Sequence, residues 1–98
     1  MIIIVPITVH DKLVPKNDRK LYSRVVYAHM DVDLNITIKE VKKNFVKMYK
    51  EVIGIDFSDR DIRVSIKGRC PGDMETCEDY EVHSSTNIEF HVSQPKHH

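Results

Sequence analysis

The sequence lacks an excess of charge of either sign. Its 98 residues include 15 lysines and arginines and 15 aspartates and glutamates, so the formal net charge is zero. A chain without net charge has no long-range field to guide it to nucleic acid or to anionic lipid. Binding driven by charge must come from local groups, and we expect nucleic acid not to be a partner.

Long hydrophobic runs and glycine-rich motifs are also missing. The apolar start at Ile2 is soon interrupted by Pro6 and charged residues, and no apolar stretch approaches the roughly 20 residues that span a bilayer. We therefore expect no membrane segment and a location in the cytoplasm, the nucleus or both. The three glycines form no phosphate loop, and no His-Glu-x-x-His pair or nucleophile elbow occurs. The sequence predicts no catalytic residue and no cofactor.

Cysteine is scarce. Cys70 and Cys77 are too few for a secreted disulfide framework, which favours reduced thiols, although their spacing permits a single bridge. With His83 and His91 they offer groups that zinc binds, but the gap between the cysteines departs from the short Cys-x-x-Cys hairpin. The sequence predicts no metal site.

What remains is the composition of one globular domain. With 41% hydrophobic and 31% charged residues, the chain can bury one core and has no room for two. We expect one domain over residues 1–94 and a flexible tail over 95–98. The two final histidines fit a native end and an expression tag equally well.

Residue patterns predict four strands. β-Branched side chains fill residues 2–9, and a second strand over 22–33 is expected to pair back on the first as a hairpin. The polar composition of residues 10–20 predicts a mobile loop between them. Alternating apolar and polar residues predict half-buried strands at 62–66 and 88–92, with an acidic link before the first of these and a turn-rich connection between them.

One amphipathic helix is predicted over residues 37–53. Thr37 and Glu40 have the spacing of a capping box, and Gly54 suits the left-handed conformation that ends a helix. Apolar residues fall between them at helical spacing. The members of this stripe are Ile38, Val41, Phe45, Met48 or Tyr49, and Val52.

The order strand, strand, helix, strand, strand describes an α+β fold with one helix on one mixed sheet. The chain resembles ubiquitin, without gaps from Arg63 to Val92, and again around the helix. The residues that carry the resemblance are Thr37, Ile38, Val41, Phe45, Gly54, Ile55, Arg63, Val64, Ile66, Gly68, Thr76, Asp79, Tyr80, Val82, Ile88, Phe90 and Val92. The resemblance implies the ubiquitin-like β-grasp, an inward-facing Cys77, and a Tyr80 hydroxyl bonded to the backbone near residues 71–73.

Two departures from ubiquitin bear on function. No Gly-Gly pair occurs, and Pro95 lies where a conjugated tail must be flexible, so we expect no attachment through the C-terminus. Ubiquitin's aliphatic recognition patch is also absent. The matching positions on the outer face of the sheet are Arg63, Ser65, Lys67, Glu89 and His91, whose charges are costly for an apolar receptor to desolvate.

The first hairpin offers a different patch. If Ile3 and Val5 face inward, then Ile2, Ile4 and Pro6 face outward beside Val25, Tyr27 and His29, which predicts an exposed apolar partner site with an aromatic member. A shift of one residue would bury Ile2 and Ile4 instead. The sequence leaves both registers open.

These features predict a non-catalytic protein-interaction module, an adaptor or a domain of a larger protein of the ubiquitin pathway. Proteasome or E3 ligase components are the expected partners, and a Ras-binding or scaffold-type β-grasp is the alternative. Weak self-association is also conceivable between a basic helix face and an acidic loop. The basic residues are Lys39, Lys43, Lys47 and Lys50, and the acidic ones are Asp73, Glu75, Glu78, Asp79 and Glu81. A solvated helix face is the better explanation of the lysines, because the net charge is zero and no aromatic residues are interleaved for stacking.

Overall fold

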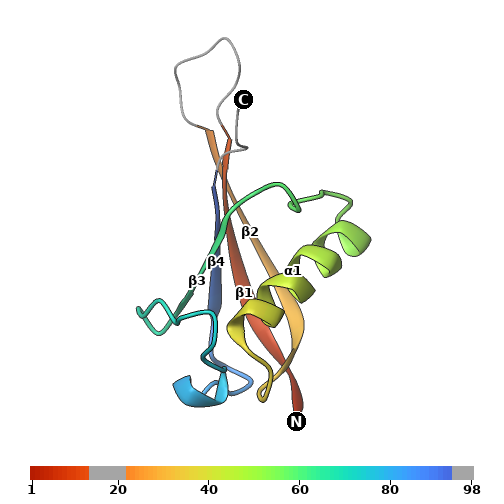
Figure 1. The fold of residues 1–98 in the computed structure, drawn as a ribbon. Coiled ribbons are helices and arrows are strands. Elements are labelled where there is room, and N and C mark those ends of the chain that lie inside the picture. Colours follow the sequence, from red (N-terminus) through yellow and green to blue (C-terminus); the bar gives the residue numbers. More distant parts are fainter. Residues whose placement is uncertain (14–21, 94–98) are drawn as a thin grey trace.

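The structure, a computed structural model, describes residues 1–13 and 22–93. One α-helix lies across one face of a sheet (Figure 1). The elements are β1 (Ile2–Leu13), β2 (Tyr22–Asp33), α1 (Ile38–Val52), β3 (Ile62–Ile66), a short 3-10 turn (Glu78–Tyr80) and β4 (Ile88–Val92).

The strands form one mixed sheet in the order β2-β1-β4-β3. β1 pairs antiparallel with β2 and parallel with β4, and β4 pairs antiparallel with β3. The first and last strands therefore lie together in the middle, and β2 and β3 form the edges. This topology is the ubiquitin-like β-grasp, so the predicted fold class is confirmed.

The core closes as the sequence predicts. Ile66, Ile88 and Phe90 meet Val41 and Phe45 in a single cluster of buried side chains. The rings of Phe45 and Phe90 stack with their centroids 4.0 Å apart. Offset stacking of this kind adds to the stabilisation from burying the two rings.

One core residue was missed. Phe57 lies in the acidic link before β3 and is fully buried. Its ring stacks on that of Tyr49 at 4.8 Å and lies 6.2 Å from that of Phe45. The link is therefore anchored to the core by one aromatic ring.

The helix begins and ends near the predicted residues. The Thr37 hydroxyl oxygen accepts from the Glu40 N–H at 3.4 Å, and Gly54 adopts φ +85° while its N–H donates to the Tyr49 and Lys50 carbonyls. The predicted stripe is correct except at its end. Val52 is 73% exposed and lies in the lining of a groove between α1 and β2.

β1 is longer than predicted. Its ladder with β2 runs without a bulge from Ile2 opposite Asp33 to Leu13 opposite Tyr22, so the loop predicted from His10 is wrong for residues 10–13. The rest of that loop, residues 14–20, and the predicted tail at 95–98 lie outside the described residues.

A buried ion cluster explains the polar end of β1. The Asp11 side chain is only 1% exposed, and its two oxygens accept from Arg60 at 2.9 Å and Arg24 at 3.1 Å. Arg60 also donates to the Lys12 and Ser93 carbonyls. A carboxylate can be buried when it is paired and hydrogen-bonded in this way. The two arginines are 13 and 49 residues away along the chain, so no local pattern indicates that Asp11 is buried.

The loop after β3 caps the helix. The Glu75 and Asp73 carbonyls accept from the first two helical N–H groups, those of Ile38 and Lys39, at 2.7 and 3.0 Å. These donors have no partner within a helix. Lys42 pairs with the Asp73 carboxylate at 2.8 Å, so this loop and the start of α1 form one unit.

The Glu75 side chain organises this loop. Its carboxylate accepts from the Gly72 N–H at 2.7 Å and from the Tyr80 hydroxyl at 2.9 Å. The expectation that Tyr80 bonds directly to the loop backbone is therefore wrong, because the carboxylate stands between the hydroxyl and the backbone. The hydrogen bond from Tyr80 to Glu75 raises the pKa of the phenol.

We expect Glu75→Ala to lower the free energy of unfolding by about 1–2 kcal/mol, because two hydrogen bonds to a charged acceptor are lost at the helix start. Tyr80→Phe removes one of the two bonds and should cost less. Urea unfolding followed by circular dichroism measures both. Tyr27→Phe, on an exposed ring, is the control and should leave the midpoint unchanged; equal midpoints for all four proteins would contradict this account of the loop.

Candidate protein interaction surfaces

The face of the sheet turned away from α1 carries nearly all the residues predicted to bind a partner. Side chains of directly paired residues share a face. The register pairs Thr8 with Tyr27 and with Glu89, and Glu89 with Ser65. The outer face therefore carries Ile2, Ile4, Pro6, Thr8, His10, Val25, Tyr27, His29, Arg63, Ser65, Glu89 and His91.

An exposed apolar patch runs along the hairpin on this face. Tyr27 is 79% exposed, Ile2 68%, Ile4 60% and Val25 44%. The register that buries Ile2 and Ile4 is therefore wrong. Pro6 lies between the isoleucines and the Tyr27 ring along the paired strands, so the apolar positions form a continuous track.

Two histidines lie beside this track. The rings of His10 and His91 stack with centroids 4.7 Å apart, and His10 Nε2 lies 3.1 Å from Glu89 Oε1. Burial lowers the pKa of His91, and the neighbouring His10 and Arg63 lower it further, while Glu89 opposes them. Its surroundings therefore favour the neutral form of the His91 ring. The sequence did not predict His10 as a residue of the outer face, because the first strand was expected to end at residue 9. The observed strand runs to Leu13 and includes His10.

Lys67 does not lie on the sheet. It follows the end of β3, adopts φ +52° and donates from its ammonium group to the Glu81 carbonyl at 3.3 Å. The outer face of the sheet therefore ends before Lys67, because β3 ends at Ile66. Arg63 and Ser65 remain on it.

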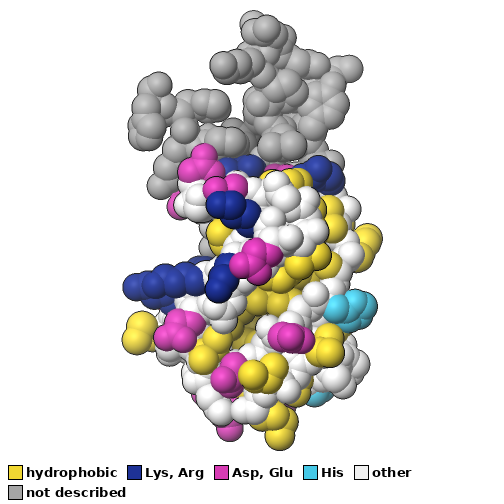
Figure 2. Space-filling model, turned by 90° about the vertical axis from the view of Figure 1, so that its right-hand side faces the viewer, with side chains coloured by type: hydrophobic (Ala, Val, Ile, Leu, Met, Phe, Trp, Pro, Cys, Tyr) yellow, Lys and Arg dark blue, Asp and Glu magenta, His cyan; other side chains and the backbone are white. Residues whose placement is uncertain are grey.

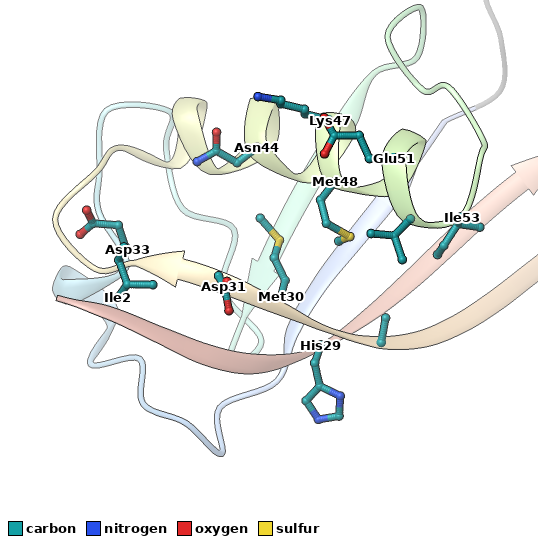
Figure 3. Close-up of a pocket in the computed structure, with 12 residues that line it drawn as sticks. Ile2, His29, Met30, Asp31, Asp33, Asn44, Lys47, Met48, Glu51 and Ile53 are labelled. Atoms are coloured by element: carbon teal, nitrogen blue, oxygen red, sulfur yellow. The ribbon is translucent and has the colours of Figure 1, made fainter.

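A second surface, absent from the sequence-based expectations, is an apolar groove of about 530 Å³ between α1 and β2. Figure 2 shows hydrophobic side chains gathered in this hollow beneath the helix. Met30 and Met48 project into it from the strand and the helix, whereas His29 points to the opposite face of the sheet (Figure 3). Alternating apolar residues on β2 were the available signal. The lining residues include Ala28, Met30, Lys47, Met48, Val52 and Ile53.

The predicted acidic loop adjoins the start of the helix that carries the predicted basic residues, since the Lys39 N–H donates to the Asp73 carbonyl. The four helix lysines are exposed, and Lys50 lies 3.8 Å from Asp56. Within the acidic loop, the Asp73 carboxylate pairs with Lys42, and the Glu75 carboxylate accepts from the Gly72 N–H of the same loop. Two of these acids therefore already have internal partners.

The cysteines are free thiols: Cys70 is exposed and Cys77 is buried, and burial raises the pKa of Cys77 to about 11. The inward position of Cys77 is confirmed. Within residues 1–13 and 22–93, His, Cys, Asp and Glu side chains form no group that could hold a metal ion. Over the same residues, no helix is both long and apolar enough to cross a membrane.

The mixed sheet in the order β2-β1-β4-β3 with one helix across it gives this chain the ubiquitin-like β-grasp fold. Among solved structures, the chain is similar to a ubiquitin-like protein from Trypanosoma brucei, with 16% identity, a TM-score of 0.49, and coverage of 93% of this chain and 94% of that one. It is also similar to the C-terminal ubiquitin-like domain of mouse tubulin-specific chaperone E, with 13% identity, a TM-score of 0.40, and coverage of 97% and 92%. No protein-family model and no curated protein matches the chain.

Proposed function

We propose that this chain is a non-catalytic protein-interaction module that binds a partner through the outer face of its sheet. The observation that carries the proposal is the exposure of Tyr27 beside Ile2 and Ile4. A folded protein gains nothing in stability from placing such side chains in water. Exposed aromatic and aliphatic residues grouped on one face are typical of protein-binding sites.

The surroundings of the patch suit a protein partner. Asp31 lies opposite Ile4, His29 lies opposite Pro6, and His10, His91 and Glu89 continue the face across β4. An apolar centre with a polar rim is the usual anatomy of a protein interface. The charged rim would exclude receptors built for a wholly aliphatic patch, because such a receptor would take water from Arg63 and Glu89 and offer them no polar partner of its own.

We place the module in the ubiquitin pathway, in the cytoplasm or the nucleus, with a proteasome or E3 ligase component as its partner and no attachment through its own C-terminus. The support for this finer assignment is the β-grasp together with the absence of a Gly-Gly pair. The Ras-binding or scaffold-type alternative predicts a small GTPase or a like-folded partner instead.

The test compares three immobilised proteins: the wild type, Tyr27→Ala and Met74→Ala. Met74 is 79% exposed, the same as Tyr27, but lies in the loop after β3, so it controls for the loss of an exposed large side chain. Proteins captured from a lysate by the wild type and Met74→Ala, and lost from Tyr27→Ala, are identified by quantitative mass spectrometry. One of them is then purified and titrated.

For the purified partner, we expect Tyr27→Ala to weaken binding by about thirtyfold, since a hot-spot tyrosine is worth about 2 kcal/mol. Met74→Ala should bind as the wild type does. Circular dichroism should show the same fold in all three. Partners that bind Tyr27→Ala with unchanged affinity would show that the outer face is not the binding site.

A further inference from the structure

The free edge of β2 carries an inference that goes beyond the proposed function and uses a different surface. β2 is an edge strand, and no strand in the described part of the chain pairs with its outer side. The ladder with β1 extends through Tyr22–Asp33 without a bulge. Natural edges are usually short, bulged, or protected by proline or by charged side chains, lysine above all. This strand has no proline and no lysine, and its charged residues, Arg24, Asp31 and Asp33, lie towards its ends and leave residues 25–30 without a charge.

The backbone groups that face this edge can be identified. Leu34 N donates to Met1 O at 3.0 Å, which makes Met1 and Leu34 a hydrogen-bonded pair in the register of the hairpin. Hydrogen-bonded pairs alternate with pairs that share no bond. The β2 residues that turn their N–H and C=O away from β1 are therefore Ser23, Val25, Tyr27, His29, Asp31 and Asp33.

The apolar groove lies directly above this edge. A strand added beside β2 would place every second side chain on the side of α1, where Met48, Val52 and Ile53 line the groove. Figure 3 shows Met48 and Ile53 on this side of the strand. The occupant must therefore offer backbone hydrogen bonds and small or flexible apolar side chains at alternate positions.

β2 itself meets these requirements. On the side facing α1 it presents Val26, Ala28 and Met30, which are apolar and partly or fully buried. We propose that a second copy of this chain is the occupant, and that two β2 strands pair antiparallel about a two-fold axis near Ala28. The sheets of the two copies then join into one continuous sheet. Val26, Ala28 and Met30 of each copy would lie beside the groove between α1 and β2 of the other copy and cover it.

Charge favours this pairing. Asp31 and Asp33 lie near one end of β2 on the outer face of the sheet, whereas Arg24 lies near the other end on the face turned to α1, where it is paired with Asp11. Parallel strands would place the two carboxylates of each copy beside their counterparts, whereas antiparallel strands carry them to opposite ends of the seam. With zero formal net charge, the two copies also have no long-range repulsion to overcome. The contact is isologous, as in most closed dimers.

Sedimentation velocity over a concentration series tests the pairing. The wild type should approach twice the chain mass of 11.5 kDa as concentration rises. His29→Pro deletes an N–H that points to the free edge, so the β1 ladder is kept while the edge is blocked. We expect it to weaken the dimer by about tenfold or more, since the substitution removes one backbone hydrogen bond from each of the two copies, each worth up to about tenfold, and the rings also obstruct the neighbour.

His29→Ala is the matched control, because it removes the same side chain and keeps the N–H; it should dimerise as the wild type does. Val52→Glu places a charge in the groove at an exposed helix position and should also weaken the dimer, which covers the case in which the proline variant fails to fold. A wild type that remains at 11.5 kDa would overturn the proposal and leave the edge to another protein. A dimer that survives both His29→Pro and Val52→Glu would overturn it too.

Discussion

Arg60→Leu is expected to lower the free energy of unfolding by about 3–5 kcal/mol, the usual result of removing one partner from a buried ion pair. Arg60 and Asp11 are 6% and 1% exposed and 2.9 Å apart. Without the guanidinium, the carboxylate stays buried with only part of its hydrogen bonding satisfied. The Lys12 and Ser93 carbonyls also lose a donor. Urea unfolding at neutral pH measures the change.

Arg24→Leu is the matched control, because Arg24 bonds to the other oxygen of the same carboxylate but is 47% exposed. Solvent screens this pair, so we expect a loss of only about 1 kcal/mol or less. The double variant Asp11→Leu with Arg60→Leu should be more stable than Arg60→Leu alone, since no unpaired charge remains. Equal losses for Arg60→Leu and Arg24→Leu would show that burial does not set the strength of this cluster.

Phe57→Ala is expected to cost about 3–5 kcal/mol, the range for removing a fully buried aromatic ring. The ring stacks on Tyr49 at 4.8 Å, and nothing in a link without regular structure can move in easily to fill the space. The Arg60 guanidinium lies 5.4 Å from the centre of the same ring. Thermal unfolding by calorimetry measures the loss.

Phe57→Leu keeps most of the volume and should cost less than about 1.5 kcal/mol. The loss from Phe57→Ala combined with Arg60→Leu should differ from the sum of the single losses, because the two side chains touch and share the Asp11 cluster. Phe57 is fully buried, so we regard it as the anchor of the link. A loss below about 1 kcal/mol for Phe57→Ala would contradict this role.

The sequence predicted the features that depend on neighbouring residues. Thr37 with Glu40 and then Gly54 marked both ends of α1, and alternation marked β3 and β4. Tyr27 and Ile4 were identified as surface residues once a register was assumed. That register could not be chosen from the strand alone, because Ile2 to Val5 are apolar on both faces.

What the sequence could not predict depends on distant partners. Asp11 read as a loop residue, since its neutralising Arg60 comes 49 residues later. Phe57 was overlooked because its neighbours are acidic and only the fold brings Tyr49 above it. The groove beside β2 is likewise a product of how the helix crosses the sheet, which no local pattern specifies.

The parallel pairing of β1 with β4 has a consequence for synthesis on the ribosome. A nascent chain that has released the hairpin and the helix still lacks the strand that completes the middle of the sheet, so Phe45 has no Phe90 ring to cover it. Such a chain exposes apolar surface and an open strand edge at the same time, the state most prone to aggregate. The sheet and the core can therefore be completed only after the last strand has emerged.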